Sequence, residues 1–142
     1  MPELLNSVPD NFEFCGHIGR DNISSFYDNS RISVMCSIWY EGFPSTILEP
    51  MMQGKPIIAS RIGGIPEIVD EGVTGLLFEP GNADDLAEKI RYLWDNPELC
   101  EKLGRAGREK ALREYSPQKY YQHLMAVYEK AIELGPGGTS HR

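Results

Sequence analysis

The chain has 142 residues, of which 41% are hydrophobic and 25% charged, and its formal net charge is −7. This length and composition predict one globular domain that buries about two-thirds of its unfolded surface. The acidic balance argues against a nucleic-acid or anionic-membrane surface. No apolar run approaches the ~18 residues of a membrane-spanning helix, and Met1-Pro2-Glu3 does not resemble the start of a signal peptide.

Strands and helices are predicted to alternate along the first half of the chain. Residues 1–11 are polar and contain proline, which predicts a loop. The elements that follow are a strand at 12–15, a helix at 23–28, a strand at 32–37, a helix at 45–53, a strand at 57–60, a helical turn at 66–69 and a strand at 76–78. Asp21 or Asn22 should cap the first helix, with Phe26 and Tyr27 facing inward, and Gly54 should end the second.

Three longer helices are predicted in the second half, at 83–95, 97–113 and 117–134. Asn82 and the Ser116-Pro117 pair are start signals, and Gly135 is a stop signal. Apolar residues recur at helical spacing in all three helices, and in the middle one they include Leu103 and Leu112. In the last helix we interpret the tyrosines as packing residues, namely Tyr120, Tyr121 and Tyr128.

This order of elements predicts an α/β fold, in which a Rossmann-like parallel sheet is flanked by helices over residues 1–134. Residues 135–142 should form a disordered tail. Four strands are few for a freestanding domain of this class, and the segment 12–15 should form an exposed sheet edge.

The three cysteines, Cys15, Cys36 and Cys100, form no Cys-x-x-Cys pair. Cys15 and Cys36 lie in apolar strand-like runs, which predicts buried thiols rather than disulfides or metal ligands. We therefore expect a reducing, cytoplasmic compartment.

The most informative stretch runs from Glu41 to Glu49 and places seven residues between two carboxylates. Glu41 should lie in the loop at the carboxyl end of the strand 32–37, where open α/β sheets bind ligands. Glu49 should lie in the following helix, about 6 Å along its axis from Ser45 at about 1.5 Å per residue. The amides of Ser45, Thr46 and Ile47 begin that helix and would form an anion site. Two carboxylates around an anion site suit a polyol that carries phosphate.

This stretch resembles the E-x7-E element of retaining glycosyltransferases with the GT-B fold, of the glycosyl transferases group 1 type. Two neighbouring runs, Gly54 to Ser60 and Gly63 to Leu77, resemble the segments that follow that element in the family. The resemblance extends in order from about Phe12 to Leu77. It implies the C-terminal, donor-binding half of a GT-B enzyme, truncated at its N-terminal side.

The resemblance implies a role for each matching residue. Glu41 would face the donor hexose as the catalytic carboxylate, and Glu49 would bind the ribose hydroxyls of a nucleoside diphosphate sugar. Further donor-binding residues would be Gly42, Phe43, Ser45, Thr46, Ile47, Arg20, Gly63 and Gly64. The alternatives are that both glutamates are solvated acids, that Arg20 is a surface residue, and that Gly63-Gly64 is a plain tight turn.

Several residues depart from the family pattern or carry less information. Pro44 replaces a common glycine and removes an amide, and Pro50 replaces a common alanine inside the helix. His17 has no evident partner acid or nucleophile. The pair Asp84-Asp85 is better explained by helix capping than by metal binding, and the resemblance implies no metal or other cofactor.

The resemblance predicts transfer of a sugar from a nucleoside diphosphate sugar to an acceptor hydroxyl, for assembly of a polysaccharide or glycolipid. A glycan or lipid acceptor would bind through a missing N-terminal domain, and peripheral membrane association of the full enzyme stays open. The isolated chain should not turn over. The alternatives are a non-catalytic, partner-dependent module that keeps the fold, and a nucleotide-sugar epimerase.

Overall fold

The computed structural model describes residues 8–135. The described elements are α2 (Arg20–Asp28), β1 (Ser33–Met35), α3 (Ser45–Met52), β2 (Ile57–Ser60), α4 (Ile65–Ile68), β3 (Gly75–Phe78), α5 (Ala83–Asp95), α6 (Pro97–Glu114) and α7 (Pro117–Leu134). Residues 1–7 of the predicted loop at 1–11 and residues 136–142 of the predicted tail at 135–142 lie outside the described residues.

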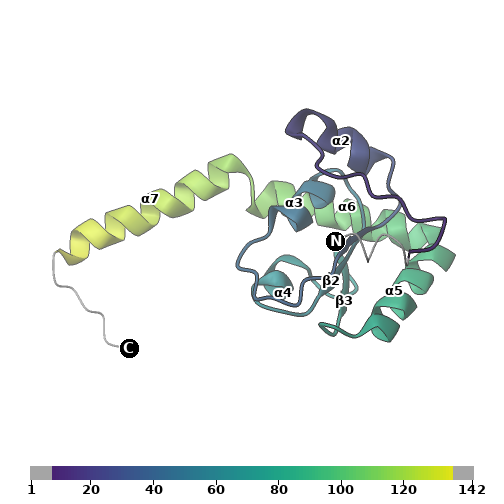
Figure 1. Ribbon diagram of the computed structural model, residues 1–142. Helices are drawn as coiled ribbons and strands as arrows, with labels where there is room; N and C mark the ends of the chain where they lie inside the picture. Colours follow the sequence, from purple (N-terminus) through teal and green to yellow (C-terminus); the bar gives the residue numbers. More distant parts are fainter. Residues whose placement is uncertain (1–7, 136–142) are drawn as a thin grey trace.

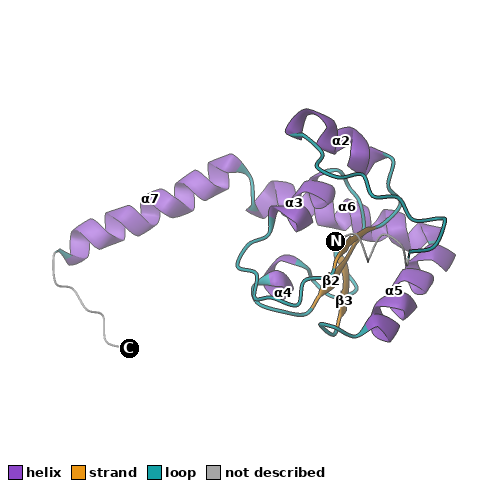
Figure 2. Cartoon of the chain, viewed as in Figure 1, coloured by secondary structure: helices purple, strands orange, loops and turns teal. Residues whose placement is uncertain are grey.

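The sheet has three parallel strands in the order β1-β2-β3. Figures 1 and 2 show helices on both sides of it. Ile57 and Ala59 of β2 face one buried cluster with residues of α3, α4 and α6, whereas Ile58 faces a second cluster with residues of α5 and α6. This confirms the predicted α/β fold. The sheet is parallel and helices cover both of its faces, as is usual for parallel sheets.

The predicted strand at 12–15 is wrong, since the described residues of this segment form no strand. Phe12 and Phe14 are each 56% exposed, and their rings contact each other with centroids 4.9 Å apart. A strand forms only where a neighbour accepts its backbone hydrogen bonds, and nothing in residues 8–135 pairs with this segment. The sheet edge on this side is therefore β1.

The prediction of buried thiols is wrong for Cys15 and Cys36, which are exposed, whereas Cys100 is buried. Cys15 lies in the segment that forms no strand. Cys36 follows Met35, the last residue of β1, so it lies beyond the paired part of the sheet. The thiol of Cys100 donates to the carbonyl of Leu93, with Sγ and O 3.1 Å apart.

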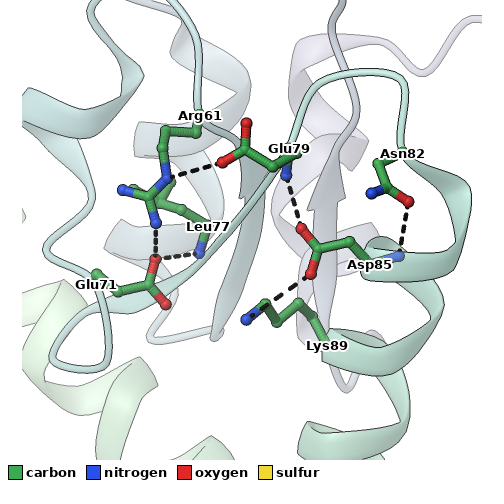
Figure 3. A network of polar contacts seen from close by, with 7 residues as sticks. All are labelled: Arg61, Glu71, Leu77, Glu79, Asn82, Asp85 and Lys89. Atoms are coloured by element: carbon green, nitrogen blue, oxygen red, sulfur yellow. Dashed lines mark hydrogen bonds and ion pairs between the residues drawn. The ribbon is translucent and has the colours of Figure 1, made fainter.

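The outer strand β3 is tied to its neighbours by a polar network (Figure 3). Glu71 accepts from the Leu77 amide at 2.9 Å and from Arg61 Nη2 at 2.8 Å. Asp85 accepts from the Glu79 amide at 2.8 Å, while Asn82 caps α5 by accepting from the Asp85 amide at 3.1 Å. This confirms the predicted cap at Asn82 and gives Asp85 a structural partner at the start of α5.

Helix α6 is the central helix of the domain because it contacts both clusters. Its buried face includes Leu103, Gly104, Gly107 and Lys110, while Leu112 is 54% exposed, contrary to prediction. The Lys110 ammonium is buried but paired, since it donates to Asp70 Oδ1 at 2.8 Å and to the Glu67 carbonyl at 3.2 Å. A buried charge needs such partners, because removal from water destabilises it.

Helix α7 runs over the predicted residues and is capped by Ser116, which accepts from the Lys119 amide at 3.3 Å. Figure 1 shows it extending away from the sheet and its covering helices. None of its described residues is buried, and Tyr120, Tyr121 and Tyr128 are all more than half exposed. The predicted packing of these tyrosines is therefore not seen in residues 8–135. None of the described helices combines the length and hydropathy needed to cross a membrane.

Two glycines of α6 should differ in how strongly substitution by alanine destabilises the protein. In the interior of an exposed helix, alanine is more favourable than glycine by about 1 kcal/mol. A Cβ at Gly104 would overlap the carbonyl oxygen of Gly54, which is backbone and cannot move away freely. A Cβ at Gly107 would lie 3.3 Å from the Thr74 oxygen and 3.7 Å from flexible Met51 atoms. Gly104→Ala should therefore destabilise the protein by about 2 kcal/mol or more, and Gly107→Ala by clearly less. Urea unfolding followed by circular dichroism measures both; equal midpoints would contradict the prediction.

Candidate functional site

Two loops meet at the carboxyl ends of the strands. The loop after β1 carries Glu41 and leads into α3, and the loop after β2 carries Gly63 and Gly64 and leads into α4. The amide of Gly64 donates to the carbonyl of Glu41 at 2.8 Å. Because parallel neighbours end at the same sheet edge, this hydrogen bond joins the two loops at that edge.

Gly63 and Gly64 contact the Glu41 loop through their backbones. A Cβ at Gly63 would overlap the carbonyl oxygen of Glu41, and a Cβ at Gly64 would overlap that of Gly42. Gly63 also has φ of +57°, a conformation that favours glycine. The alternative of a tight turn is therefore supported, because both glycines pack against the backbone of Glu41 and Gly42. Contact of these glycines with a donor stays a prediction.

The Glu41 carboxylate is oriented by Ser37, the second residue after β1. Ser37 Oγ lies 3.1 Å from Glu41 Oε1 and 3.2 Å from both the amide and the carbonyl of Trp39. A hydroxyl has one proton, so at any moment it donates either to the carboxylate or to the Trp39 carbonyl. Ser37 therefore ties the bend of this loop to the direction of the Glu41 side chain.

The start of α3 leaves fewer free amides than predicted. Pro44 is the N-cap residue, and the amide of Ile47 donates to the Pro44 carbonyl at 3.2 Å. Ile47 is also fully buried. Among residues 8–135, the hydrogen bonds include none from the amides of Ser45 and Thr46. An anion at this helix start would therefore bind the amides of Ser45 and Thr46. The Ile47 amide, which was also predicted to bind it, is already bonded to the Pro44 carbonyl.

Glu49 is exposed on α3 and receives a hydrogen bond from another helix. Tyr27 Oη of α2 donates to Glu49 Oε2 at 3.3 Å. Burial and the nearby Glu49 carboxylate together raise the pKa of the Tyr27 phenol above its ordinary value. Helix α3 continues through Pro50 to Met52, so Glu49 keeps its helical position despite the proline.

Other predicted site residues are more scattered. Phe43 is 56% exposed and contacts Tyr115 edge to face, with ring centroids 5.1 Å apart. Arg20 is the first residue of α2, three residues before the predicted helix start, and its side chain lies outside the described part. Gly19 is the N-cap of that helix, so neither Asp21 nor Asn22 caps it. Tyr27 is half-buried as predicted, whereas Phe26 is 44% exposed.

Glu41 and Glu49 are thus each held through one oxygen by a hydroxyl donor, and within residues 8–135 neither forms an ion pair. Sequence reasoning missed both donors. Ser37 could have been identified from the sequence, because it lies only four residues before Glu41. Tyr27 lies 22 residues from Glu49, and only the packing of α2 on α3 brings the two together.

A family model described as "Glycosyl transferases group 1" matches residues 5–110. An uncharacterized glycosyltransferase of Methanocaldococcus jannaschii is 39% identical over 118 residues, which cover 83% of this chain and 33% of that protein. The MMP alpha-(1->4)-mannosyltransferase of Mycolicibacterium hassiacum is 40% identical over 113 residues, covering 79% of this chain and 27% of that protein.

Solved structures share the fold of this chain. Sucrose-phosphate synthase from Thermosynechococcus elongatus superposes with a TM-score of 0.83 at 28% identity, covering 91% of this chain and 33% of that one. Anabaena HepE, solved in complex with UDP, superposes with a TM-score of 0.75 at 24% identity, covering 79% of this chain and 31% of that one, and supports the fold. This chain therefore spans about a third of the length of the proteins that it matches.

Substitution of Gly64 by alanine should disrupt the contact between the two loops that positions Glu41. The new Cβ would overlap the Gly42 carbonyl oxygen and push the loops apart, breaking the bond from the Gly64 amide to Glu41. We expect a loss of about 2 kcal/mol in unfolding free energy and displaced amide resonances for Glu41 and Gly42. Gly19→Ala is the matched control, because Gly19 has φ of −66° and open space around it. Equal stability of the two variants in urea would refute this account.

The contact between Tyr27 and Glu49 has a measurable titration signature. Glu49→Gln removes a charge that raises the Tyr27 pKa, so that pKa should fall, yet remain above the ordinary value because burial is the larger cause. A folded pKa above the unfolded value of about 10 means that stability is fully present below pH ~10 and is lost as pH rises through the folded pKa. Carbon-13 NMR of the tyrosine ring measures the titration, with Glu129→Gln as control. An unmoved Tyr27 pKa would show that the contact is absent in solution.

Proposed function

Because this chain belongs to the glycosyl transferases group 1 family, we propose that it is the nucleotide-sugar-binding part of a retaining glycosyltransferase. The full protein would move a sugar from a nucleoside diphosphate sugar to an acceptor hydroxyl. The observation that carries the proposal is the pair of carboxylates, Glu41 and Glu49, each oriented by a hydroxyl and neither neutralised by a cation in residues 8–135.

The chemistry of the donor fits this arrangement. A carboxylate accepts hydrogen bonds from two hydroxyls at once, so Glu49 would take the ribose hydroxyls and Glu41 those of the donor hexose. The diphosphate would lie between them against the amides of Ser45 and Thr46, at the positive end of α3. No resident metal or cofactor is needed for these contacts, because the nucleoside diphosphate sugar is itself the substrate.

In the transfer step, the acceptor oxygen forms a bond to C1 of the sugar as the bond from C1 to the diphosphate oxygen breaks. The hydroxyl proton goes to the departing diphosphate. Amides aimed at the diphosphate would stabilise the charge that develops on it. Contacts with the acceptor, and the remaining contacts with the diphosphate, would come in part from the rest of a longer protein. We therefore expect this chain alone to bind the donor weakly and not to turn over.

A second reading is a partner-dependent module that has kept the fold without donor binding. The observation in its favour is that Pro44 has no amide and that the Ile47 amide is already bonded, which leaves Ser45 and Thr46 at the helix start. Loss of phosphate contacts would weaken binding while leaving the core of the domain intact.

Titration of the chain with UDP, ADP and GDP, followed by amide shifts, tests the proposal. At least one nucleotide should shift resonances of Gly42, Ser45 and Thr46. Glu49→Gln should weaken that nucleotide about tenfold, because a hydrogen bond to a charged group is worth about 1.5 kcal/mol or more. Glu129→Gln on α7 is the control. Binding of none of the three nucleotides would favour the non-catalytic module, and sugar transfer by the isolated chain would contradict the expected inactivity.

A further inference from the structure

Lys110 is a buried charge that the proposed sugar transfer does not use. Its side chain on α6 is only 8% exposed, and its ammonium donates to Asp70 Oδ1 at 2.8 Å and to the Glu67 carbonyl at 3.2 Å. A buried ion pair is weak evidence for stability, because taking the charges out of water offsets much of their attraction. The position of Lys110 is therefore better explained by the geometry that it imposes on its partners.

The two acceptors of Lys110 lie at the end of α4. Glu67 belongs to this helix of four residues, and Asp70 is the second residue after it. The Glu67 carbonyl also accepts a hydrogen bond from Tyr115 Oη at 3.3 Å. A single helical turn has few hydrogen bonds of its own and is not stable in isolation. Donors from the end of α6 therefore fix where α4 lies.

Three successive hydrogen bonds connect Lys110 to the loop that carries Glu41. The first runs from the Lys110 ammonium to the Glu67 carbonyl at 3.2 Å. The second runs from the Glu67 amide to the Gly64 carbonyl at 3.1 Å, and the third from the Gly64 amide to the Glu41 carbonyl at 2.8 Å. A displacement of α4 would therefore move the Gly64 amide relative to Glu41.

A second connection reaches the same loop through two aromatic rings. Tyr115 is the C-cap residue of α6, and its ring contacts that of Phe43 edge to face, with centroids 5.1 Å apart. Phe43 lies two residues after Glu41. Because the Tyr115 hydroxyl also donates to the Glu67 carbonyl, the two connections form a closed ring of contacts. The Glu41 loop cannot shift relative to α4 without breaking at least one of them.

We infer that Lys110 is a positioning residue of the donor site, which acts through α4 and the Gly63-Gly64 turn on the loop that carries Glu41. Tyr115 contributes to the same role through its hydroxyl. The inference rests on the proposed function, since a positioning residue requires a donor to be bound.

Hydrogen exchange of the Lys110→Met variant tests the positioning directly. Methionine is an unbranched apolar side chain that cannot donate, and Asp70 is 49% exposed and can be hydrated, so the variant should fold. The Gly64 amide should exchange about tenfold faster relative to the amides of β2, because a charge-assisted hydrogen bond to α4 is lost. The comparison with β2 removes the contribution of global unfolding. Lys110→Arg, which keeps the charge, should retain most of the protection.

Tyr115→Phe is a second variant with a smaller structural change, because it keeps the ring against Phe43 and removes only the hydroxyl. It should speed exchange of the Gly64 amide in the same direction, by less than Lys110→Met does, because a neutral hydrogen bond is the weaker one. Exchange of Gly64 that follows β2 in both variants would overturn the inference.

Nucleotide affinity is the readout that a purely structural role would leave unmoved. Of UDP, ADP and GDP, those that bind the unchanged chain should bind Lys110→Met about fivefold more weakly. Lys102→Met is the matched control, since Lys102 lies on the exposed side of the same helix. Cys100→Ala, in the second buried cluster, controls for lost stability. Neither control should change the affinity.

The outcomes separate this inference from the proposed function. Where a nucleotide binds the unchanged chain and Lys110→Met binds it as tightly as Lys102→Met does, the inference is wrong and the proposed function stands. Where none of the three nucleotides binds the unchanged chain, the proposed function fails and the role of Lys110 in donor binding falls with it.

Discussion

The contact of two backbones at the sheet edge is the constraint on which the site depends. Gly63 and Gly64 lie so close to Glu41 and Gly42 that no side chain could stand between them. The hydrogen bond from the Gly64 amide to the Glu41 carbonyl fixes the distance at 2.8 Å. Since β1 and β2 are hydrogen-bonded neighbours, the sheet brings these loops together, and the glycines permit the final approach. The position of the Glu41 carboxylate follows from this contact and from the Ser37 hydroxyl.

Helix α6 packs against the segments that follow and connect these loops. Gly104 packs on the Gly54 carbonyl at the end of α3, and Lys110 reaches the Glu67 carbonyl after the Gly63-Gly64 turn. At its C-terminal end, Tyr115 contacts both the Glu67 carbonyl and the ring of Phe43. Three positions along this helix and its C-cap therefore hold the segment after α3, helix α4 and the Glu41 loop together. Small residues allow the first of these contacts, and hydrogen-bond donors make the others.

Local signals predicted much of this domain, and tertiary contacts explain the rest. Asn82 and Ser116 acted as caps, β2 covers the predicted residues, and Glu41 and Glu49 lie on the predicted loop and helix. The strand at 12–15 failed because apolar residues form a strand only beside a partner. On the buried face of α6, Leu103 was predicted correctly, Leu112 was not, and Gly104 and Gly107 were missed because close packing there leaves no room for larger apolar residues. Tyr27 was missed as a partner of Glu49 because no local pattern reports a contact between two helices.

The charges around Glu41 and Glu49 would set how a donor lies in the proposed site. Carboxylates held by hydroxyls favour a ligand rich in hydroxyl donors and disfavour an anion placed directly against them. The donor's own phosphates would avoid both carboxylates by lying at the start of α3, where the amides of Ser45 and Thr46 favour negative charge. The same ligand would thus be oriented by charge, with its hydroxyls at the two carboxylates and its diphosphate at the helix start.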